Sequence, residues 1–215
     1  MNSLHDPKIA RVLQTLHDAA RHDPERRAAR SAADDDSLIR MGDMYLAVSP
    51  GEGRLLYLLA RGCRAVRLVE FGASFGISTT YLAAAARDNG GALITTEVHP
   101  DKCAATRRVL AEAGLENVAT VLEGDARETL TGVEGPIDFV FLDGWKSLYL
   151  PVLEILLPKL ETGTLIVADN IDHEGAKDYA ARVRSGEDFV SHTLGKQEIS
   201  AFTGAARARR GEGNR

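Results

Sequence analysis

The sequence predicts an α/β fold in which a doubly wound parallel sheet carries helices on both faces. From residue 55 onward, short apolar runs alternate with helical stretches, a rhythm that is typical of strand–helix–strand units. The runs IDFVFL and TLIVA are apolar on both faces, as expected of strands that helices cover on both sides. With 215 residues, the chain is within the usual size of a single compact domain.

Three segments are expected along the chain. Residues 1–45 are interpreted as a helical preface over one side of the domain, because apolar residues recur at helical spacing at Ile9, Val12, Leu13 and Leu16. Residues 46–204 are expected to hold the sheet. Residues 205–215 mix arginine with glycine and predict a disordered tail, with a tether to nucleic acid or to a membrane as the alternative.

The same alternation places the elements of the main domain. Helices are expected at residues 78–88, 102–114 and 148–160, after the third strand, and up to about Arg184. Ligands of open parallel sheets bind beyond the carboxyl ends of the strands, so the residues that end each strand are the candidates for a site. Those strands are expected at residues 67–71, 92–98, 118–124, 137–143 and 164–170.

Composition and charge narrow the class of protein. Apolar residues make up 44%, charged residues 27%, and no window nears the roughly 20 apolar residues of a membrane-spanning helix. The first residues, MNSLHDPK, lack the apolar core of a signal peptide, so we expect a cytoplasmic protein without a membrane partner. A net charge of −5 does not favour nucleic acid as a partner. Cys63 and Cys103 have no metal-binding spacing and are expected to be reduced and buried.

A glycine-rich turn follows the first strand. Residues 70–76 read EFGASFG and run into a helix that carries Ser78. Gly72 and Gly76 permit a tight turn and a close approach of a ligand to the backbone, and the helix N-terminus offers free N–H groups. Ser74 stands where the dinucleotide pattern GxGxxG has its second glycine. A plain strand-to-helix turn is the alternative.

The next two strand ends suggest a nucleoside. Glu97 ends the second strand, where a carboxylate can accept hydrogen bonds from both hydroxyls of a ribose. The turn Gly124-Asp125-Ala126 is small enough to lie against an adenine ring, although a bland turn fits it equally well on its own. Together with the glycine-rich turn, these strand ends predict a nucleoside site.

Oxygen-bearing side chains end the fourth and fifth strands. Asp143, Asp169 and Asn170 suit a hard cation such as Mg²⁺, although each alone is also typical of a helix cap or turn. Lys146 is expected in the first turn of the next helix, where the helix dipole mildly opposes a cation. A bound cation beside it would lower its pKa and make it a general base, with a surface lysine as the alternative. Trp145 is interpreted as a wall for an aromatic substrate or as core.

Five stretches of the chain carry a family resemblance: VEFGASFGIST, ITTEVHPDK, DFVFLDGWKSLYLPVLE, LIVADN and GAKDYAARVR. With them, residues 46–184 resemble the cation-dependent catechol O-methyltransferase-like family of class I methyltransferases. The resemblance implies a Rossmann-like, seven-stranded sheet, mostly parallel with an antiparallel last strand, for which residues 195–202 are our candidate. It implies S-adenosylmethionine and a divalent cation, with Mg²⁺ expected, as cofactors and a small phenolic molecule as substrate. Small members often pair, which leaves a homodimer open.

The resemblance also implies roles for site residues. It assigns the general base to Lys146 and metal ligation to Asp143, Asp169 and Asn170. Around S-adenosylmethionine it places Val48, Glu70, Gly72, Ser74, Ser78, Glu97, Ala126 and Asp143.

The chain departs from the family pattern in three places. Gly144 replaces a bulkier residue, and the adenine turn carries Ala126-Arg127 in place of polar residues. Residues 189–198 are too few to supply the usual substrate-side carboxylate, for which Glu198 is the candidate substitute. These departures concern the substrate more than the chemistry.

We therefore predict a metal-assisted O-methyltransferase that acts on a catechol-like or vicinal-diol aromatic acceptor. The cation would bind two vicinal oxygens and lower the pKa of the reacting hydroxyl, and Lys146 would accept the proton. Direct displacement at the methyl group needs no nucleophilic Cys or Ser. Three alternatives stay open: transfer to nitrogen or carbon, a nicotinamide-dependent oxidoreductase, and a non-catalytic cofactor-binding protein. The acceptor itself, a catechol, caffeoyl-like phenol, flavonoid or natural-product intermediate, is also open.

Overall fold

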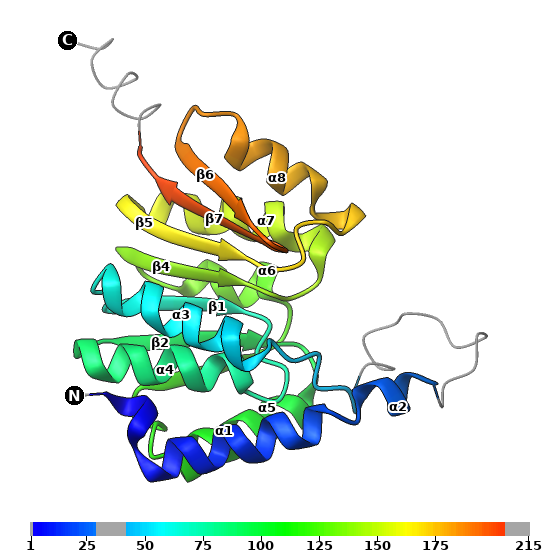
Figure 1. Cartoon of the computed structure of the whole chain (residues 1–215). Coiled ribbons are helices and arrows are strands. Elements are labelled where there is room, and N and C mark those ends of the chain that lie inside the picture. Colours follow the sequence, from blue (N-terminus) through cyan, green and yellow to red (C-terminus); the bar gives the residue numbers. More distant parts are fainter. Residues whose placement is uncertain (1, 29–41, 205–215) are drawn as a thin grey trace, which may run out of the picture.

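The core of the protein is one seven-stranded sheet (Figure 1). The computed structural model describes residues 2–28 and 42–204. Its strands are β1 (Arg67–Phe71), β2 (Ala92–Glu97), β3 (Ala119–Glu123), β4 (Ile137–Leu142), β5 (Leu160–Ala168), β6 (Phe189–Leu194) and β7 (Gln197–Phe202).

The strand order is β3-β2-β1-β4-β5-β7-β6. The pairs from β3 to β5 are parallel, whereas β7 pairs antiparallel with both β5 and β6. The prediction of a mostly parallel sheet with an antiparallel last strand is confirmed. Because β1 lies between β2 and β4, the chain reverses its direction of growth at β1 and β4, which is where open sheets of this kind bind ligands.

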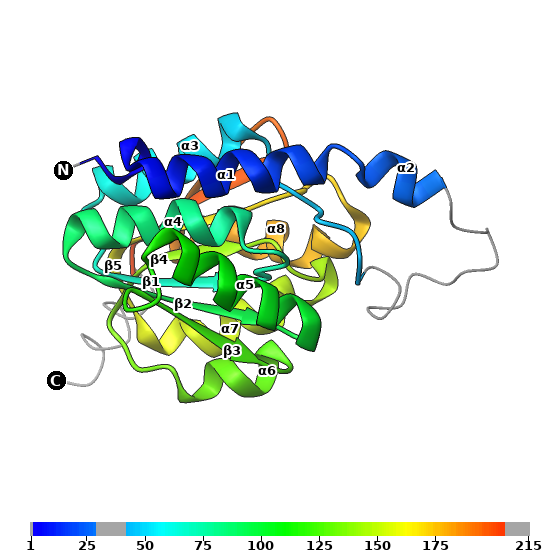
Figure 2. The same cartoon turned by 90° about the horizontal axis from the view of Figure 1, so that it is seen from below.

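Helices cover both faces of the sheet. They are α1 (Pro7–Ala20), α2 (Asp23–Ala28), α3 (Pro50–Gly62), α4 (Ile77–Asn89), α5 (Pro100–Ala113), α6 (Ala126–Thr129), α7 (Tyr149–Leu156) and α8 (Lys177–Arg184). Figure 2 shows α1, α3 and α4 on one side of the sheet and α6 and α7 on the other. Short 3-10 turns occupy Ser3–His5, Leu130–Gly132, Lys146–Leu148, Leu157–Lys159 and Glu174–Ala176.

The first helix packs on the domain as the sequence predicts. Asp6 caps α1 by accepting a hydrogen bond from the Lys8 N–H at 3.0 Å, and Pro7 begins the helix. Its apolar stripe, Ile9, Val12, Leu13 and Leu16, is buried in the main core.

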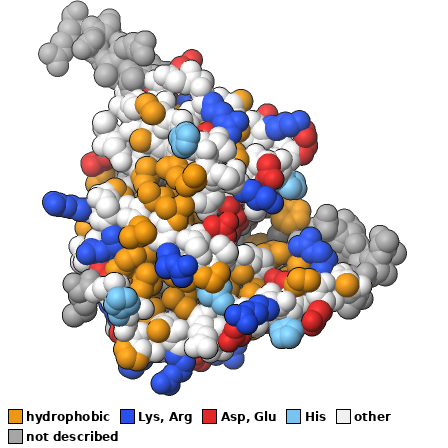
Figure 3. Space-filling model, in the orientation of Figure 1, with side chains coloured by type: hydrophobic (Ala, Val, Ile, Leu, Met, Phe, Trp, Pro, Cys, Tyr) orange, Lys and Arg blue, Asp and Glu red, His pale blue; other side chains and the backbone are white. Residues whose placement is uncertain are grey.

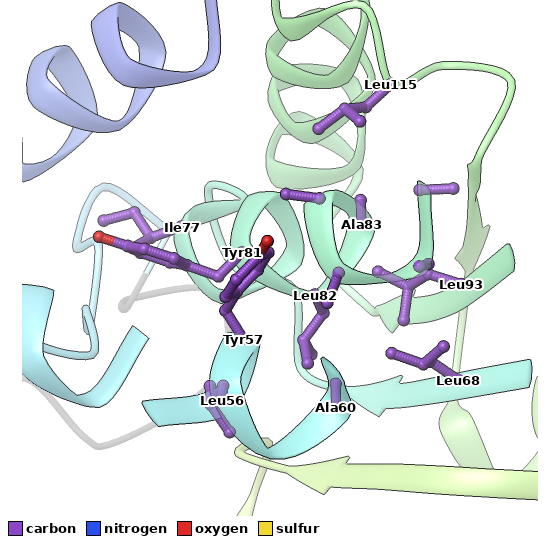
Figure 4. Packing of buried hydrophobic residues seen from close by; sticks show 14 of the residues in the cluster. Leu56, Tyr57, Ala60, Leu68, Ile77, Tyr81, Leu82, Ala83, Leu93 and Leu115 are labelled. Carbon is purple, nitrogen blue, oxygen red and sulfur yellow. The ribbon is translucent and has the colours of Figure 1, made fainter. Parts of the chain in front are cut away.

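Close packing of α3 on α4 forms the centre of this core. Figure 4 shows Leu56 and Tyr57 of α3 beside Tyr81 and Leu82 of α4. A Cβ at Gly53 would lie 2.2 Å from the Tyr81 ring, so only glycine lets the two helices approach this closely. Burial of each large apolar side chain contributes about 1.5–3 kcal/mol.

Helix α3, strand β6 and the start of β5 were not located from the sequence. The start of α3 carries a capping box, in which Ser49 accepts from the Glu52 N–H and the Glu52 carboxylate accepts from the Ser49 N–H. Strand β6 could not be located because its sequence, FVSHTL, does not alternate between apolar and polar residues. Strand β5 begins at Leu160, four residues before the expected start, and its pairing with β4 shifts register around Gly163, where φ is +97°.

Other expectations have mixed outcomes. Cys103 is buried as expected, but Cys63 is exposed next to the end of α3, so that expectation was wrong. Within residues 2–28 and 42–204, no helix is long and apolar enough to cross a membrane. The segment boundaries at residues 45 and 204 stay predictions, and the expected disordered tail lies outside the described residues.

Candidate active site

A cleft of about 1090 Å³ lies beyond the carboxyl ends of the strands. Figure 3 shows the surface hollowed there, with acidic and basic side chains nearby. Of the residues that the resemblance places around the cofactor, those that line the cleft are Val48, Gly72, Ser74, Ser78, Glu97, Ala126 and Asp143. Glu70 does not line it.

The glycine-rich turn brings backbone into the cleft. Gly72 has φ +100°, and a Cβ there would lie 2.7 Å from the backbone of Gly144, so a side chain is excluded. The N–H groups of Gly72 and Ala73 both donate to the Thr96 carbonyl, which ties the turn to β2. Gly76 precedes α4 without a side-chain cap, so N–H groups of the helix start are available to a ligand.

The Glu97 carboxylate is held in place by backbone. Its Oε2 accepts a hydrogen bond from the Ser74 N–H at 2.8 Å, and its Oε1 accepts from the N–H groups of Val98 and His99 at 2.9 Å each. Carboxylate oxygens have further lone pairs, so both can still accept hydroxyl donors from the cleft. This geometry suits the two hydroxyls of a ribose.

Glu70 lies under the turn. Its Oε2 accepts from the hydroxyls of Thr79 and Thr95 at 2.6 Å each, and its Oε1 makes no hydrogen bond within the described part of the chain. Burial raises the pKa of Glu70. The structure thus places Glu70 behind the cleft wall, and its assignment to the cofactor stays a prediction.

Asp143 and Lys146 form a partly buried ion pair that lines the cleft, with 12% and 15% of their side chains exposed. The Asp143 N–H donates to the Phe71 carbonyl at 2.9 Å. This bond extends the β1–β4 pairing and fixes Asp143 at the place between β1 and β4 where the sheet reverses its direction of growth. Lys146, in the 3-10 turn before α7, donates from Nζ to Asp143 Oδ1 at 2.8 Å. Burial raises the pKa of Asp143 to about 7; Lys146 opposes this shift, and the negative charge of Asp169 adds to it.

Asp169 and Asn170 follow the neighbouring strand. The Asp169 N–H donates to the Leu142 carbonyl at 2.9 Å, which holds Asp169 beside the end of β4, where its negative charge acts on Asp143. Asp169 is buried, its Oδ1 has no hydrogen-bond partner among the described residues, and burial raises its pKa. Asn170 has φ +51° and lines the cleft, whereas Asp169 does not.

These residues fit a hard cation. No three His, Cys, Asp or Glu side chains gather to hold a metal within residues 2–28 and 42–204, but the predicted ligand set needs only two carboxylates and one amide. The negative charge of Asp169 adds to the cost of ionising Asp143, and the buried Asp169 Oδ1 makes no hydrogen bond to the described residues. Oxygen ligands of this kind are those that Mg²⁺ prefers.

The β6–β7 hairpin contributes one residue to the cleft and withholds another. Strands β6 and β7 join through the tight turn Gly195-Lys196, and Lys196 lines the cleft. Glu198 is not brought to the cleft, because Arg184 donates to its carboxylate at 3.0 and 2.6 Å and Thr193 donates at 2.6 Å. Trp145 lines the cleft and is 40% exposed, so it forms a wall and is not core.

Some cleft residues were missed from the sequence. Lys102 is buried yet lines the cleft, and its one signal was a lysine in the first turn of a helix, where the dipole opposes it. No sequence pattern pointed to Tyr45, Leu46, His173 or Lys196.

Comparison with known proteins identifies the family. The family described as a methyltransferase domain matches residues 69–171. A catechol O-methyltransferase of Niastella koreensis is 35% identical over 144 residues, which cover 65% of each chain. A catechol O-methyltransferase of Bos taurus is 33% identical over 202 residues, which cover 90% of this chain and 72% of the bovine protein. The chain belongs to the catechol O-methyltransferase-like family of class I methyltransferases.

A solved structure agrees with this family. The O-methyltransferase TomG of Streptomyces achromogenes, in complex with S-adenosylmethionine, has a TM-score of 0.69 and 25% identity, and the match covers 88% of this chain and 99% of that one. The relatives are named O-methyltransferases and the TomG structure holds S-adenosylmethionine, so the chain is an S-adenosylmethionine-dependent O-methyltransferase and the oxidoreductase alternative is wrong.

Proposed function

We propose that the protein methylates a hydroxyl of a small catechol-like or vicinal-diol aromatic acceptor with the help of a divalent cation, Mg²⁺ being expected. The observation that carries this proposal is the Lys146–Asp143 pair at 2.8 Å beside the buried, unpaired Oδ1 of Asp169. This arrangement places the amine of Lys146, the proposed general base, beside carboxylate oxygens of Asp143 and Asp169 that could bind a cation.

The cofactor half of the cleft orients the donor. S-adenosylmethionine, when bound, supplies the methyl group. Glu97, held by three backbone N–H groups, would accept from the ribose, and the turn at Gly72 allows close approach of the backbone. Ala126 offers a small surface for the adenine.

The other half handles the acceptor. Asp143, Asp169 and Asn170 would hold the cation, which supplies positive charge that lowers the pKa of a neighbouring hydroxyl. With the cation bound, Lys146 would first release its own proton to solvent and would then take up the hydroxyl proton at Nζ, and Asp143 would keep that nitrogen in place through the 2.8 Å hydrogen bond. Trp145 offers a flat apolar wall for an aromatic ring. The names of the Niastella and bovine relatives favour a catechol among such acceptors.

A methyl-transfer screen tests this function. Purified protein is incubated with S-adenosylmethionine and a panel of phenols that carry one hydroxyl, two vicinal hydroxyls or two separated hydroxyls. We expect turnover only with vicinal hydroxyls, loss of turnover with a chelator, and recovery on addition of Mg²⁺. Turnover that a chelator leaves unchanged would contradict the metal role, and equal turnover with single hydroxyls would contradict the acceptor class.

A further inference from the structure

Asp23, the first residue of α2, binds a segment far along the chain. Its Oδ1 accepts a hydrogen bond from the Tyr45 N–H at 3.0 Å, and its Oδ2 accepts from the Leu46 N–H at 2.8 Å. Arg26 donates to the same carboxylate at 2.8 Å, and the Asp23 side chain is only 15% exposed. One carboxylate therefore fixes two successive peptide groups of another segment.

That segment is a wall of the cofactor cleft. Residues 45–48 all line the cleft. The Tyr45 carbonyl accepts from the Ser74 hydroxyl at 2.8 Å, and the Ser74 N–H donates to Glu97 at 2.8 Å. Hydrogen bonds thus run without interruption from Asp23 through the wall and the glycine-rich turn to the proposed ribose-binding carboxylate.

Two aromatic rings reinforce the same contact. Tyr45 stacks on Phe75 of the glycine-rich turn, with ring centroids 4.4 Å apart and 26° between the planes. The Arg26 guanidinium lies 5.3 Å from the Tyr45 ring, and the Lys102 ammonium lies 5.3 Å from the Phe75 ring. Cation–π and stacking contacts of this kind hold α2, the wall and the turn together.

The backbone of the wall needs this support. Leu46 has φ +50° and Ser74 has φ +47°, a conformation that residues with a Cβ rarely adopt. Such residues persist only where surrounding bonds over-determine them, and they gather at ligand sites. Asp23 bonds directly to the strained Leu46, and Ser74 bonds to its neighbour Tyr45.

We infer that Asp23 is a positioning residue for S-adenosylmethionine, acting through residues 45–48 and the glycine-rich turn. The helical preface is then part of the cofactor site and not only a cover for the core. The inference depends on the cofactor of the family and is independent of the proposed cation and acceptor. Its test therefore needs neither.

Calorimetric titration with S-adenosylhomocysteine tests the inference on Asp23→Ala, Asp23→Asn and the control Asp18→Ala. Asp18 carries an exposed ion pair with Arg21 at 3.2 Å and does not line the cleft. We expect Asp23→Ala to raise the Kd about tenfold or more, because two charge-assisted hydrogen bonds are lost. Asp23→Asn should have a smaller effect because it keeps one acceptor oxygen, and Asp18→Ala should have none.

A purely structural role for Asp23 gives a different result. It would lower the melting temperature of Asp23→Ala and leave the Kd unchanged, which would overturn the inference. Turnover offers a second readout, in which we expect a higher KM for S-adenosylmethionine and a kcat within about twofold of wild type. If Asp23→Ala does not fold, Asp23→Asn and Phe75→Leu carry the test, and a wild-type Kd in both would overturn it.

Discussion

Gly144 and Phe71 determine how closely the ends of β1 and β4 approach. A Cβ on Gly144 would lie 2.4 Å from the Phe71 ring, and a Cβ on Gly72 would lie 2.7 Å from the Gly144 backbone. Any side chain at position 144 is therefore incompatible with the Phe71 ring in its place. The Phe71 ring occupies the space that a side chain at Gly144, next to Asp143, would need.

We expect Gly144→Ala to lower the free energy of unfolding by about 1–3 kcal/mol through overpacking. The loss should shrink when Phe71→Leu is added, because a smaller side chain makes room for the new methyl group. Urea denaturation of the two single variants and the double variant measures this coupling. Gly62→Ala is the control, since nothing lies within 4 Å of a Cβ there. Additive losses would contradict the pairing.

Lys146→Ala should reduce turnover about 10²- to 10⁴-fold, the usual contribution of a general base. The affinity for S-adenosylhomocysteine should stay within about twofold, because Lys146 is not among the residues expected to hold the cofactor. Lys177→Ala is the control, since Lys177 pairs with Glu174 at the surface, where its side chain is 69% exposed. Turnover close to that of wild type would remove Lys146 as the base.

The sequence located the strand-end residues but not the direction of their side chains. Glu97 and Asp143 follow apolar runs, and parallel strands bring their ends to one edge. Glu70 lies at the same edge, yet its side chain points under the turn to Thr79 and Thr95, because successive side chains of a strand face opposite ways. Tyr45 reaches the cleft only through packing of α2, which no spacing reveals.

At the level of elements, an ion pair with a buried carboxylate joins the β6–β7 hairpin to the end of α8. Glu198 of β7 is 1% exposed and accepts hydrogen bonds from Arg184 at the end of α8 and from Thr193 of β6. Only half of the hairpin could be predicted from the sequence. The β6 sequence FVSHTL does not alternate between apolar and polar residues, whereas the β7 sequence QEISAF carries apolar residues at every second position near its end. Its short turn brings Lys196 to the cleft.

Glu198→Gln should destabilise the protein in a pH-dependent way. Burial alone raises the pKa of Glu198, but the hydrogen bonds from Arg184 and Thr193 outweigh it, so the pKa lies below its ordinary value of 4.5. A lowered pKa stabilises the fold above pH 4.5, and this contribution is lost as the pH falls through the folded-state pKa. We expect a loss of about 1–3 kcal/mol at pH 7 that shrinks below pH 4.5.

Denaturation curves of Glu198→Gln and wild type across pH 3 to 8 measure this loss. Glu154→Gln is the control, because Glu154 pairs with Arg182 at 3.6 Å with half of its side chain exposed, and such pairs contribute little. A difference that stays constant down to pH 3 would contradict the role of the Glu198 charge.

At the level of the whole molecule, we expect a cation bound in the cleft to raise the stability of the fold. The Asp169 side chain is buried and that of Asp143 is only 12% exposed, yet Lys146 donates a hydrogen bond to Asp143 alone. Burial of uncompensated charge lowers stability, so the fold holds an unfavourable arrangement that a bound cation would relieve. The catalytic proposal therefore predicts a change in stability that needs no substrate.

Mg²⁺ should raise the melting temperature of the wild-type protein. A ligand at 100 times its Kd stabilises a folded protein by about 2.7 kcal/mol, which corresponds to roughly 5–10 °C for a domain of this size. Asp169→Asn should abolish most of the shift, while Asp172→Asn should keep it, because Asp172 is exposed in the same cleft and pairs with Lys196 at 3.8 Å. Asp169→Asn without Mg²⁺ should itself be more stable than wild type, since one buried charge is removed. An equal Mg²⁺-induced rise in melting temperature in wild type and Asp169→Asn would show that the cation binds elsewhere. The cation would then not act on the hydroxyl whose proton Lys146 accepts.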